Sequence, residues 1–203
     1  MEPLERKVFI NEISLQCGFA LHAFKQLTLS TGSDDERFYS AHSFLVHAAN
    51  VTSLLWPQRP MRLHGEDDAT LKTRKKLAAE RGKELRHLLS VAEQKDPVLR
   101  NRDLRNCLEH FDSKLDQFLH DKKPQLFVDL LVRPDFNDFD IRPEMCLRAF
   151  ATSDLEYFFL GKRFQLKPLA DALTALRHKA EGVKKGTAIY NRSQILDSTG
   201  VSR

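Results

Sequence analysis

Residues 98–121 have the sequence VLRNRDLRNCLEHFDSKLDQFLHD, and the spacing of their apolar residues predicts one continuous helix. We place its start at Asp96 and Pro97, because aspartate caps helix N-termini and proline is favoured at the first helical position. At about 100° per residue, the apolar side chains fall on one stripe that we expect to face a core: Leu104, Leu108, Phe111, Leu115 and Phe118.

Four polar residues cover the back of this predicted helix. Glu109 follows Arg105 by four residues and His110 follows Asn106 by four, so each pair can interact across one turn. Arg, Asn and Glu are expected on any solvated helix face. Histidine is neither a strong helix former nor needed for solubility. The pattern therefore leaves two interpretations open, a hydrated face and a functional site.

The rest of the chain predicts a mainly α protein with an antiparallel helical bundle. Three further helices are expected before the one described above, over 4–30, 35–56 and about 67–94. A small β-meander with turns at Ser153-Asp154 and Gly161-Lys162 is expected after Pro124. A final short amphipathic helix follows over 167–180. We divide the chain into three parts: a helical bundle over 1–123, a small α+β accessory segment packed on it over 124–181, and a flexible tail over 182–203.

Composition excludes few classes of function. The 203 residues carry a net charge of +4, which permits a polyanionic partner without requiring one. The three cysteines form no metal-binding pair, and we expect buried thiols in a reducing compartment. There is no apolar run of membrane-spanning length and no secretory signal pattern, so we expect a cytoplasmic protein with no membrane association.

Motifs for cofactors and metals are missing from the sequence. The eight glycines match neither the dinucleotide-binding nor the P-loop spacing, and there is no nucleophile elbow or HExxH helix. The acidic segment DFNDFD over 135–140 has a phenylalanine where a calcium loop needs an oxygen ligand. We therefore expect neither a cofactor nor a metal site.

The first predicted helix, over 4–30, is apolar on two sides. Its second strip consists of Val8, Leu15 and Phe19, which we expect another chain or the C-terminal segment to cover. In a two-fold dimer each helix meets its own copy, and two Arg/His sets then share one cleft. Such a cleft suits RNA cleavage without a metal, because histidine can move the proton of a 2′-hydroxyl and a guanidinium can stabilise the charge that grows on the phosphate.

The segment LRNCLEHFD, over 104–112, resembles the signature of the HEPN superfamily of all-α bundles, in which an Arg, a polar residue and a His recur at this spacing. Arg105, Asn106 and His110 match that signature. The longer segments DPVLRNRDLRNCLEHFDSKLDQFL and RFYSAHSFLVHAANVTSLLWP resemble bacterial HEPN-like proteins, and the likeness covers roughly residues 5–120. It implies a HEPN-like bundle, a homodimer and, as in many members, a metal-independent endoribonuclease of the toxin or phage-defence class.

By this resemblance Arg105 and His110 are the catalytic residues and Asn106 positions the substrate. The resemblance also extends to Glu109 and Asp112 as substrate-binding or positioning residues, and Arg102 is expected at the rim of the cleft. Toxins that are paired with a nucleotidyltransferase antitoxin carry a Tyr where this chain has Asp112, which argues against that branch. An antitoxin or other protein partner is still possible.

Two alternatives to the ribonuclease stay open. Some HEPN domains bind a nucleotide, RNA or a protein partner without cleaving anything, because a fold does not fix a function. The other alternative is a structural dimer whose polar helix face is simply hydrated.

Overall fold

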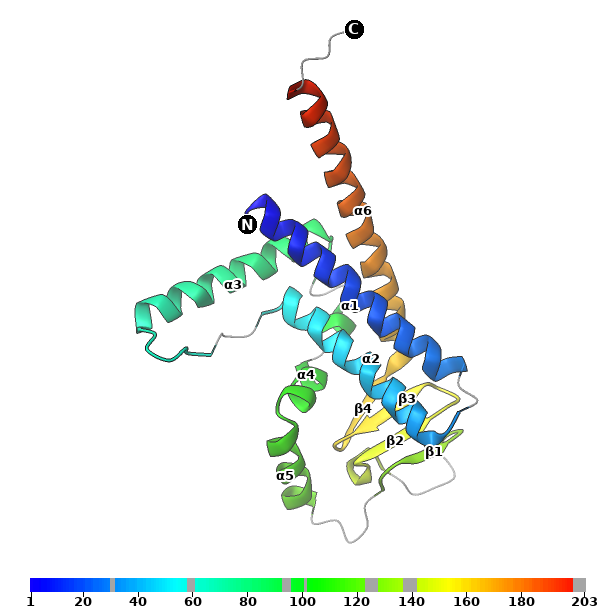
Figure 1. Ribbon diagram of the computed structural model, residues 1–203. Coiled ribbons are helices and arrows are strands. Elements are labelled where there is room, and N and C mark those ends of the chain that lie inside the picture. Colours follow the sequence, from blue (N-terminus) through cyan, green and yellow to red (C-terminus); the bar gives the residue numbers. More distant parts are fainter. Residues whose placement is uncertain are drawn as a thin grey trace.

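The computed structural model describes residues 1–29, 32–57, 61–92, 96–100, 102–122, 128–136 and 142–198. The chain is mainly helical with a small sheet at its C-terminal side, which confirms the predicted class (Figure 1). In chain order the elements are α1 (Pro3–Leu29), α2 (Asp34–Leu55), α3 (Asp68–Leu88), the 3₁₀ helix η1 (Pro97–Arg100), α4 (Arg102–Glu109), α5 (Phe111–Lys122), β1 (Leu131–Arg133), η2 (Pro143–Met145), β2 (Arg148–Ala151), β3 (Glu156–Phe159), β4 (Lys162–Gln165) and α6 (Leu166–Ser198).

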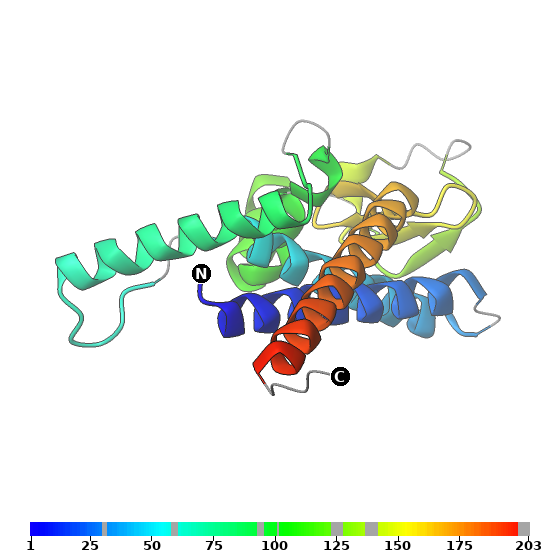
Figure 2. The same cartoon turned by 90° about the horizontal axis from the view of Figure 1, so that it is seen from above.

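Three long helices form the centre of the molecule. Helices α1 and α2 lie side by side in opposite directions, and α6 crosses α1 (Figure 2). A capping box fixes the start of α2, since Ser33 and Glu36 each bond to the other's backbone amide. Small residues such as Ala20 and Ala41 are fully buried in this core and let the helices approach closely.

The sheet has the strand order β1-β2-β3-β4. Strands β2, β3 and β4 are antiparallel neighbours, which confirms the predicted meander. The turn between β3 and β4 uses Leu160 and Gly161, both with positive φ, which suits the tight hairpin. Strand β1 was not predicted; it is only three residues long and pairs in parallel with β2.

One face of the sheet is aromatic and joins the helical core. Because side chains alternate along a strand, Phe150 on β2 lies on the same face as its partner Tyr157 on β3 and as Phe159 two residues later. Phe164 on β4 pairs with Tyr157 and completes this aromatic face. All four are buried in one cluster with residues of α1, α2 and α6. The opposite face holds a separate, smaller cluster that includes Phe158.

The predicted single helix over 98–121 is wrong, because the segment is divided. It comprises η1, α4 and α5, with a turn at His110 where the axis changes direction (Figure 1). Helical hydrogen bonds still join His110 N–H to the Asn106 carbonyl (3.2 Å) and Lys114 N–H to the His110 carbonyl (2.9 Å). The segment is therefore a kinked helix, and one wheel cannot describe both halves.

Tertiary packing accounts for the kink. Helix α4 packs on α2 and buries Cys107, whereas two aromatic side chains of α5 contact β3 and the turn after it. The Phe111 ring stacks on Phe159, and the Phe118 ring lies 3.6 Å from the Cβ position of Gly161. The two halves of the segment pack on different elements, so its apolar side chains do not form the single stripe that was expected along one face.

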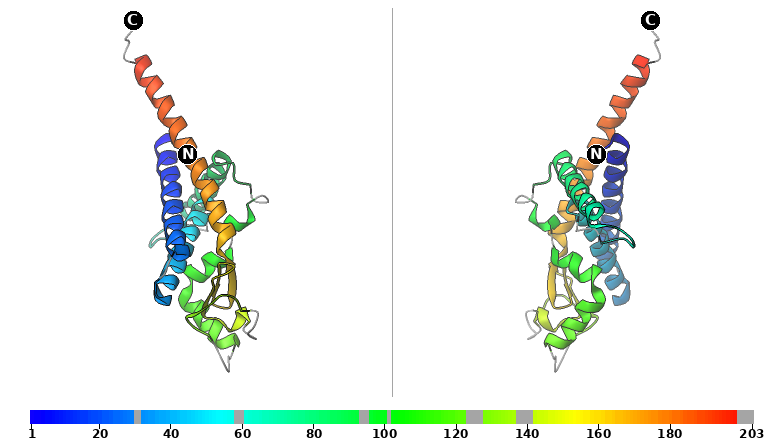
Figure 3. Two further views of the ribbon diagram at one scale, coloured as in Figure 1. Left: turned by 90° about the vertical axis from the view of Figure 1, so that its right-hand side faces the viewer. Right: turned by 90° about the vertical axis from the view of Figure 1, so that its left-hand side faces the viewer.

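The final helix is also longer than predicted. Helix α6 continues to Ser198 instead of ending near residue 180, and it occupies most of the segment that was expected to be a flexible tail. Its C-terminal half projects beyond the other helices (Figure 3). The sequence after residue 181 contains no proline, and lysine, alanine and glutamine there are compatible with a helix although the segment lacks an apolar period. None of the described helices has the length and apolarity to cross a membrane.

Helix α3 projects from the body and contacts it mainly near its C-terminal end (Figure 2). At Gly82 the helix passes so close to the end of α2 that an added Cβ would lie 2.5 Å from Pro57 Cδ and 2.8 Å from the Leu55 carbonyl oxygen. A carbonyl oxygen cannot move aside without shifting the backbone. The absence of a side chain at this residue therefore sets how α3 docks on α2.

We expect Gly82→Ala to lower the free energy of unfolding by about 1–3 kcal/mol, because overpacking at a rigid contact outweighs the gain in helix propensity. Gly182→Ala is the matched control, since nothing lies within 4 Å of its Cβ position on α6. That control should gain about 0.5–1 kcal/mol. Urea denaturation measures both; equal stabilisation by the two substitutions would contradict the close contact.

Candidate functional site

Two cavities are lined in part by residues of α4 and α5, which meet at the kink. We call the first, of about 260 Å³, the polar cavity; it is lined by Asp103, Asn106, Cys107, Lys114, Gln117, Phe118, Leu160, Gly161 and Lys162. We call the second, of about 490 Å³, the aromatic cavity; it is lined by Phe38, Tyr39, His42, Leu108, Phe111, Leu130, Arg148, Tyr157 and Phe159. Both combine residues of the kinked segment with residues of the sheet.

The predicted site residues are only partly brought together. Asn106 is half-buried and lines the polar cavity, and its carbonyl accepts the backbone N–H of His110. His110 and Asp112 are exposed. The side chains of the other predicted residues lie outside the described part of the structure, although their backbone belongs to α4: Arg102, Arg105 and Glu109. The pairing of Arg105 with Glu109 and the placement of the Arg105 guanidinium therefore stay predictions.

The polar cavity brings two lysines close to this segment. Lys114 lies one turn after His110 and donates from Nζ to Gln117 Oε1 at 2.8 Å. Lys162, from the start of β4, forms an ion pair with Asp103 at 3.4 Å. Lys162 lies 48 residues further along the chain than Lys114, so the sequence alone does not bring the two together. Its only sequence signal is the Gly161-Lys162 turn.

The aromatic cavity is walled by ring systems from three elements, α2, α5 and β3. Phe111 and Phe159 are stacked with their planes at 1° and their centroids 5.9 Å apart. His42, on α2, meets Phe159 edge-on at 5.7 Å, and Phe38 meets Tyr157 at 6.2 Å. Offset and edge-on contacts of this kind stabilise aromatic clusters. Tyr39, 75% exposed, stands at the mouth.

Three polar residues belong to the aromatic cavity besides the exposed Tyr39. Arg148 donates from Nε and Nη2 to the two carboxylate oxygens of Asp129 at 2.8 and 2.7 Å, and this pairing raises the pKa of Arg148. Burial lowers the pKa of His42, and the positive charge of Arg148 lowers it further. Burial also raises the pKa of Tyr157, whose hydroxyl has no hydrogen-bond partner within the described residues. His42 and Tyr157 are therefore uncharged at neutral pH.

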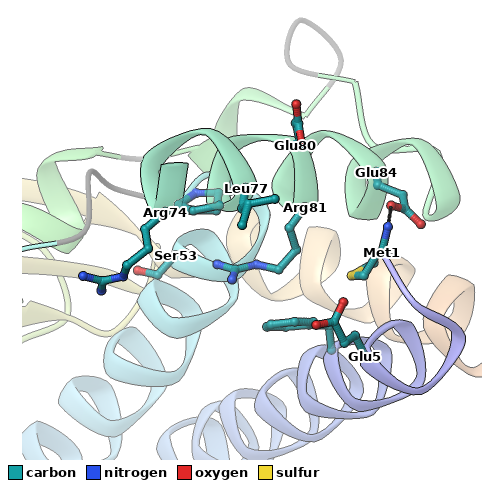
Figure 4. Close-up of a pocket in the computed structure, with 11 residues that line it drawn as sticks. Met1, Glu5, Ser53, Arg74, Leu77, Glu80, Arg81 and Glu84 are labelled. Carbon is teal, nitrogen blue, oxygen red and sulfur yellow. Dashed lines mark hydrogen bonds and ion pairs between the residues drawn. The ribbon is translucent and has the colours of Figure 1, made fainter. Parts of the chain in front are cut away.

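A third cavity, of about 550 Å³, lies between α1, α2 and α3 (Figure 4). Three of its charged side chains, Arg74, Glu80 and Glu84, form ion pairs, mostly with residues outside the lining. Glu84 accepts from the Met1 ammonium at 2.9 Å and from Arg6 at 2.8 Å, and the Arg81 guanidinium lies 4.5 Å from the centroid of the Phe9 ring. These contacts join α3 to α1. We interpret this cavity as the space beside a structural ion cluster.

The cysteines are free and buried, as predicted. Burial raises the pKa of Cys17 to about 12 and that of Cys146 to about 11, and it also raises the pKa of Cys107. These thiols stay protonated at neutral pH and are poor nucleophiles. In the part of the chain that the structure describes, no group of three or more His, Cys, Asp or Glu side chains is arranged to hold a metal ion.

The second apolar strip of α1 is exposed in the single chain. Val8, Leu15 and Phe19 have exposed fractions of 56%, 48% and 45%, so the C-terminal segment does not cover them. Coverage of the strip by a second chain therefore stays a prediction.

Comparison of the chain with protein-family models, curated proteins and solved structures finds no match. The HEPN resemblance therefore depends on the sequence segments quoted above and stays an expectation.

We expect the stability of the fold to fall between pH 7.5 and pH 5.5. The unfolded chain protonates His42 near the ordinary histidine pKa, about 6.5, whereas the folded chain binds that proton only at lower pH. Stability from the neutral ring is therefore lost as the pH falls through that value. The pKa of His47 is also lowered by burial, so this residue contributes to the same loss of stability on acidification.

Urea denaturation of wild type and His42→Gln at the two pH values tests this expectation. The loss of stability on acidification should be smaller in the variant, whatever its stability at pH 7.5. An equal loss in both proteins would contradict the account of the His42 environment. Carboxylates whose pKa is lowered, such as Glu66 and Glu84, change the free energy of unfolding only in more acidic solution.

Proposed function

We propose that the protein is a metal-independent endoribonuclease of the HEPN kind, with His110 as general acid/base and Arg105 stabilising the scissile phosphate. The observation that carries this proposal is the exposed position of His110 at the kink, next to a cavity that contains Asn106 and two lysines. A catalytic histidine must reach the substrate, and lysine side chains nearby attract its phosphates. The match to the HEPN signature supports the same residues.

The proposed reaction is an intramolecular transesterification, in which the 2′-hydroxyl of a nucleotide attacks its own 3′-phosphate. A neutral imidazole takes the proton of the 2′-hydroxyl while the 2′-oxygen bonds to phosphorus. The bond from phosphorus to the 5′-oxygen breaks, and a protonated imidazole supplies the proton that this oxygen needs. The products are a 2′,3′-cyclic phosphate and a 5′-hydroxyl. Two imidazoles in opposite protonation states fit a homodimer in which each copy contributes His110 to one cleft.

The exposed strip of α1 supports the homodimer part of the proposal. Leu4, Val8, Leu15 and Phe19 are exposed large apolar side chains on one helix. Apolar side chains gathered in this way favour association over contact with water. A toxin or phage-defence role, and an antitoxin or other protein partner, follow from the resemblance alone.

A noncatalytic module that binds nucleotide, RNA or a protein is the second candidate. The aromatic cavity favours it, because aromatic walls and a few polar groups are typical of ligand sites. This candidate needs the cavity but not a reactive His110.

RNA digestion in EDTA tests the first candidate. We expect the wild type to leave 2′,3′-cyclic phosphate ends and His110→Ala to lose cleavage by about 10²–10⁴-fold, the contribution typical of a general acid/base. The control is His64→Ala, which removes an exposed histidine before α3 and should cut like the wild type.

The other outcomes separate the candidates. If the wild type does not cut a broad set of RNAs, the noncatalytic module becomes the better proposal. Equal cutting by the wild type and His110→Ala would point to a different site or a contaminating nuclease and would remove His110 from the mechanism.

A further inference from the structure

The aromatic cavity has the lining of a site for a flat ring. Its volume of about 490 Å³ lies in the range of small-molecule sites. Two rings stand where a ligand would enter: Tyr39 is 75% exposed and Phe111 is 41% exposed. Large aromatic side chains are usually buried, and an exposed pair at one cavity mouth offers faces on which a base can stack.

One residue of the cavity lining has a polar atom without a partner among the residues that the structure describes. Tyr157 is fully buried, and its hydroxyl has no hydrogen-bond partner within the described residues. Leaving a buried polar group without a partner is costly, so such a group in a native protein points to a partner that arrives from outside. His42 adds a ring whose nitrogens can donate and accept, and the lowered pKa keeps that ring neutral.

The charge of the cavity argues for an uncharged ring and against a phosphate inside it. Arg148 is the cation of this lining, and both oxygens of Asp129 already neutralise it. A phosphate or carboxylate would have to displace that bidentate pair. A nucleobase needs no cation, since it combines an apolar face with an edge of donors and acceptors that neutral Tyr and His groups can contact.

The cavity is adjacent to the proposed catalytic residue. Phe111, at its mouth, directly follows His110 in the chain, and consecutive Cα atoms are about 3.8 Å apart. A base that stacks on Phe111 therefore brings its own ribose and phosphate to the same turn as His110. The kink is what allows this, because it turns Phe111 onto the sheet while His110 stays in solvent.

We infer that the aromatic cavity binds one unpaired nucleobase of the RNA substrate and thereby selects which phosphodiester meets His110. The assignment of a cleavage role to the neighbouring phosphate depends on the proposed function, whereas base binding by the cavity does not. The substrate class is single-stranded RNA, since a base must leave its stack to enter the cavity.

Binding to RNA that cannot be cleaved tests the cavity. The probes are four fluorescent homopolymer nonamers with 2′-O-methyl groups, which remove the attacking hydroxyl, and fluorescence anisotropy gives their dissociation constants. We expect the wild type to prefer one base. Phe111→Leu should weaken binding of the preferred probe at least about fivefold, the usual effect of losing one stacked ring.

Two further variants sharpen this comparison. Phe136→Leu is the matched control, because the Phe136 ring contacts the Phe158 ring on the opposite face of the sheet, at a centroid distance of 5.1 Å, and lies outside the cavity; it should bind like the wild type. Tyr157→Phe removes only the hydroxyl and should weaken the preferred probe about three- to tenfold, with little effect on the other three. Far-UV circular dichroism and thermal melting identify any variant that fails to fold.

The outcomes separate this inference from the proposed function. His110→Ala should bind the probes like the wild type although it does not cut. Base-selective binding by a wild type that cuts no RNA would end the nuclease proposal and leave the cavity assignment intact. Unchanged binding in folded Phe111→Leu and Tyr157→Phe proteins would overturn the cavity assignment, even if His110→Ala abolishes cleavage.

Discussion

The packing of the aromatic face of the sheet against the helices is the contact on which the rest of the structure depends. Phe150, Tyr157, Phe159 and Phe164 are buried in the same cluster as the facing residues of α1, α2 and α6. Each such side chain contributes roughly 1.5–3 kcal/mol when it leaves water. Without this face, α2 would expose Phe38 and the first turns of α6 would lose their partners.

The same face also shapes the kinked segment and its two cavities. Phe111 stacks on Phe159, and Phe118 packs over Gly161, so α5 is held on the sheet. Helix α4 is held on α2 instead. The direction of the chain has to change between these two supports, at His110. His110, which has a functional role in the proposal, is exposed at this point, and residues before and after it in the chain line the aromatic and polar cavities.

The sequence indicates much of this fold, because its longest helices and its meander have strong local patterns. The apolar spacing of residues 4–30 and 35–56 predicts α1 and α2, and the turn residues at Gly161-Lys162 predict the β3–β4 hairpin. The kink at His110 escapes prediction, since residues 98–121 keep a helical period and the cause is a contact with Phe159. The length of α6 escapes it too, since the polar sequence after residue 181 has no apolar period.

The candidate site, too, can be predicted from the sequence only in part. His110 and Asn106 stand out in the sequence because they lie one turn apart on a polar face, and both lie at the kink. The aromatic cavity could not be inferred, because it takes His42 from α2, Phe111 from α5 and Tyr157 from β3. Only the folded chain brings these residues together. The aromatic-rich segments RFY over 37–39 and YFF over 157–159 are the only local hint.

The central claim is that sheet and helices share one core, and unfolding followed at two places tests it most directly. Trp56, which packs against the helical part of that core, and Tyr157, in the sheet, report on opposite ends. In a urea titration followed by amide NMR, the account predicts that the Trp56 indole signal and the Tyr157 amide signal disappear with the same midpoint. Loss of the Tyr157 signal at lower urea, with the Trp56 signal unchanged, would show that the sheet is a separate unit and would contradict the account.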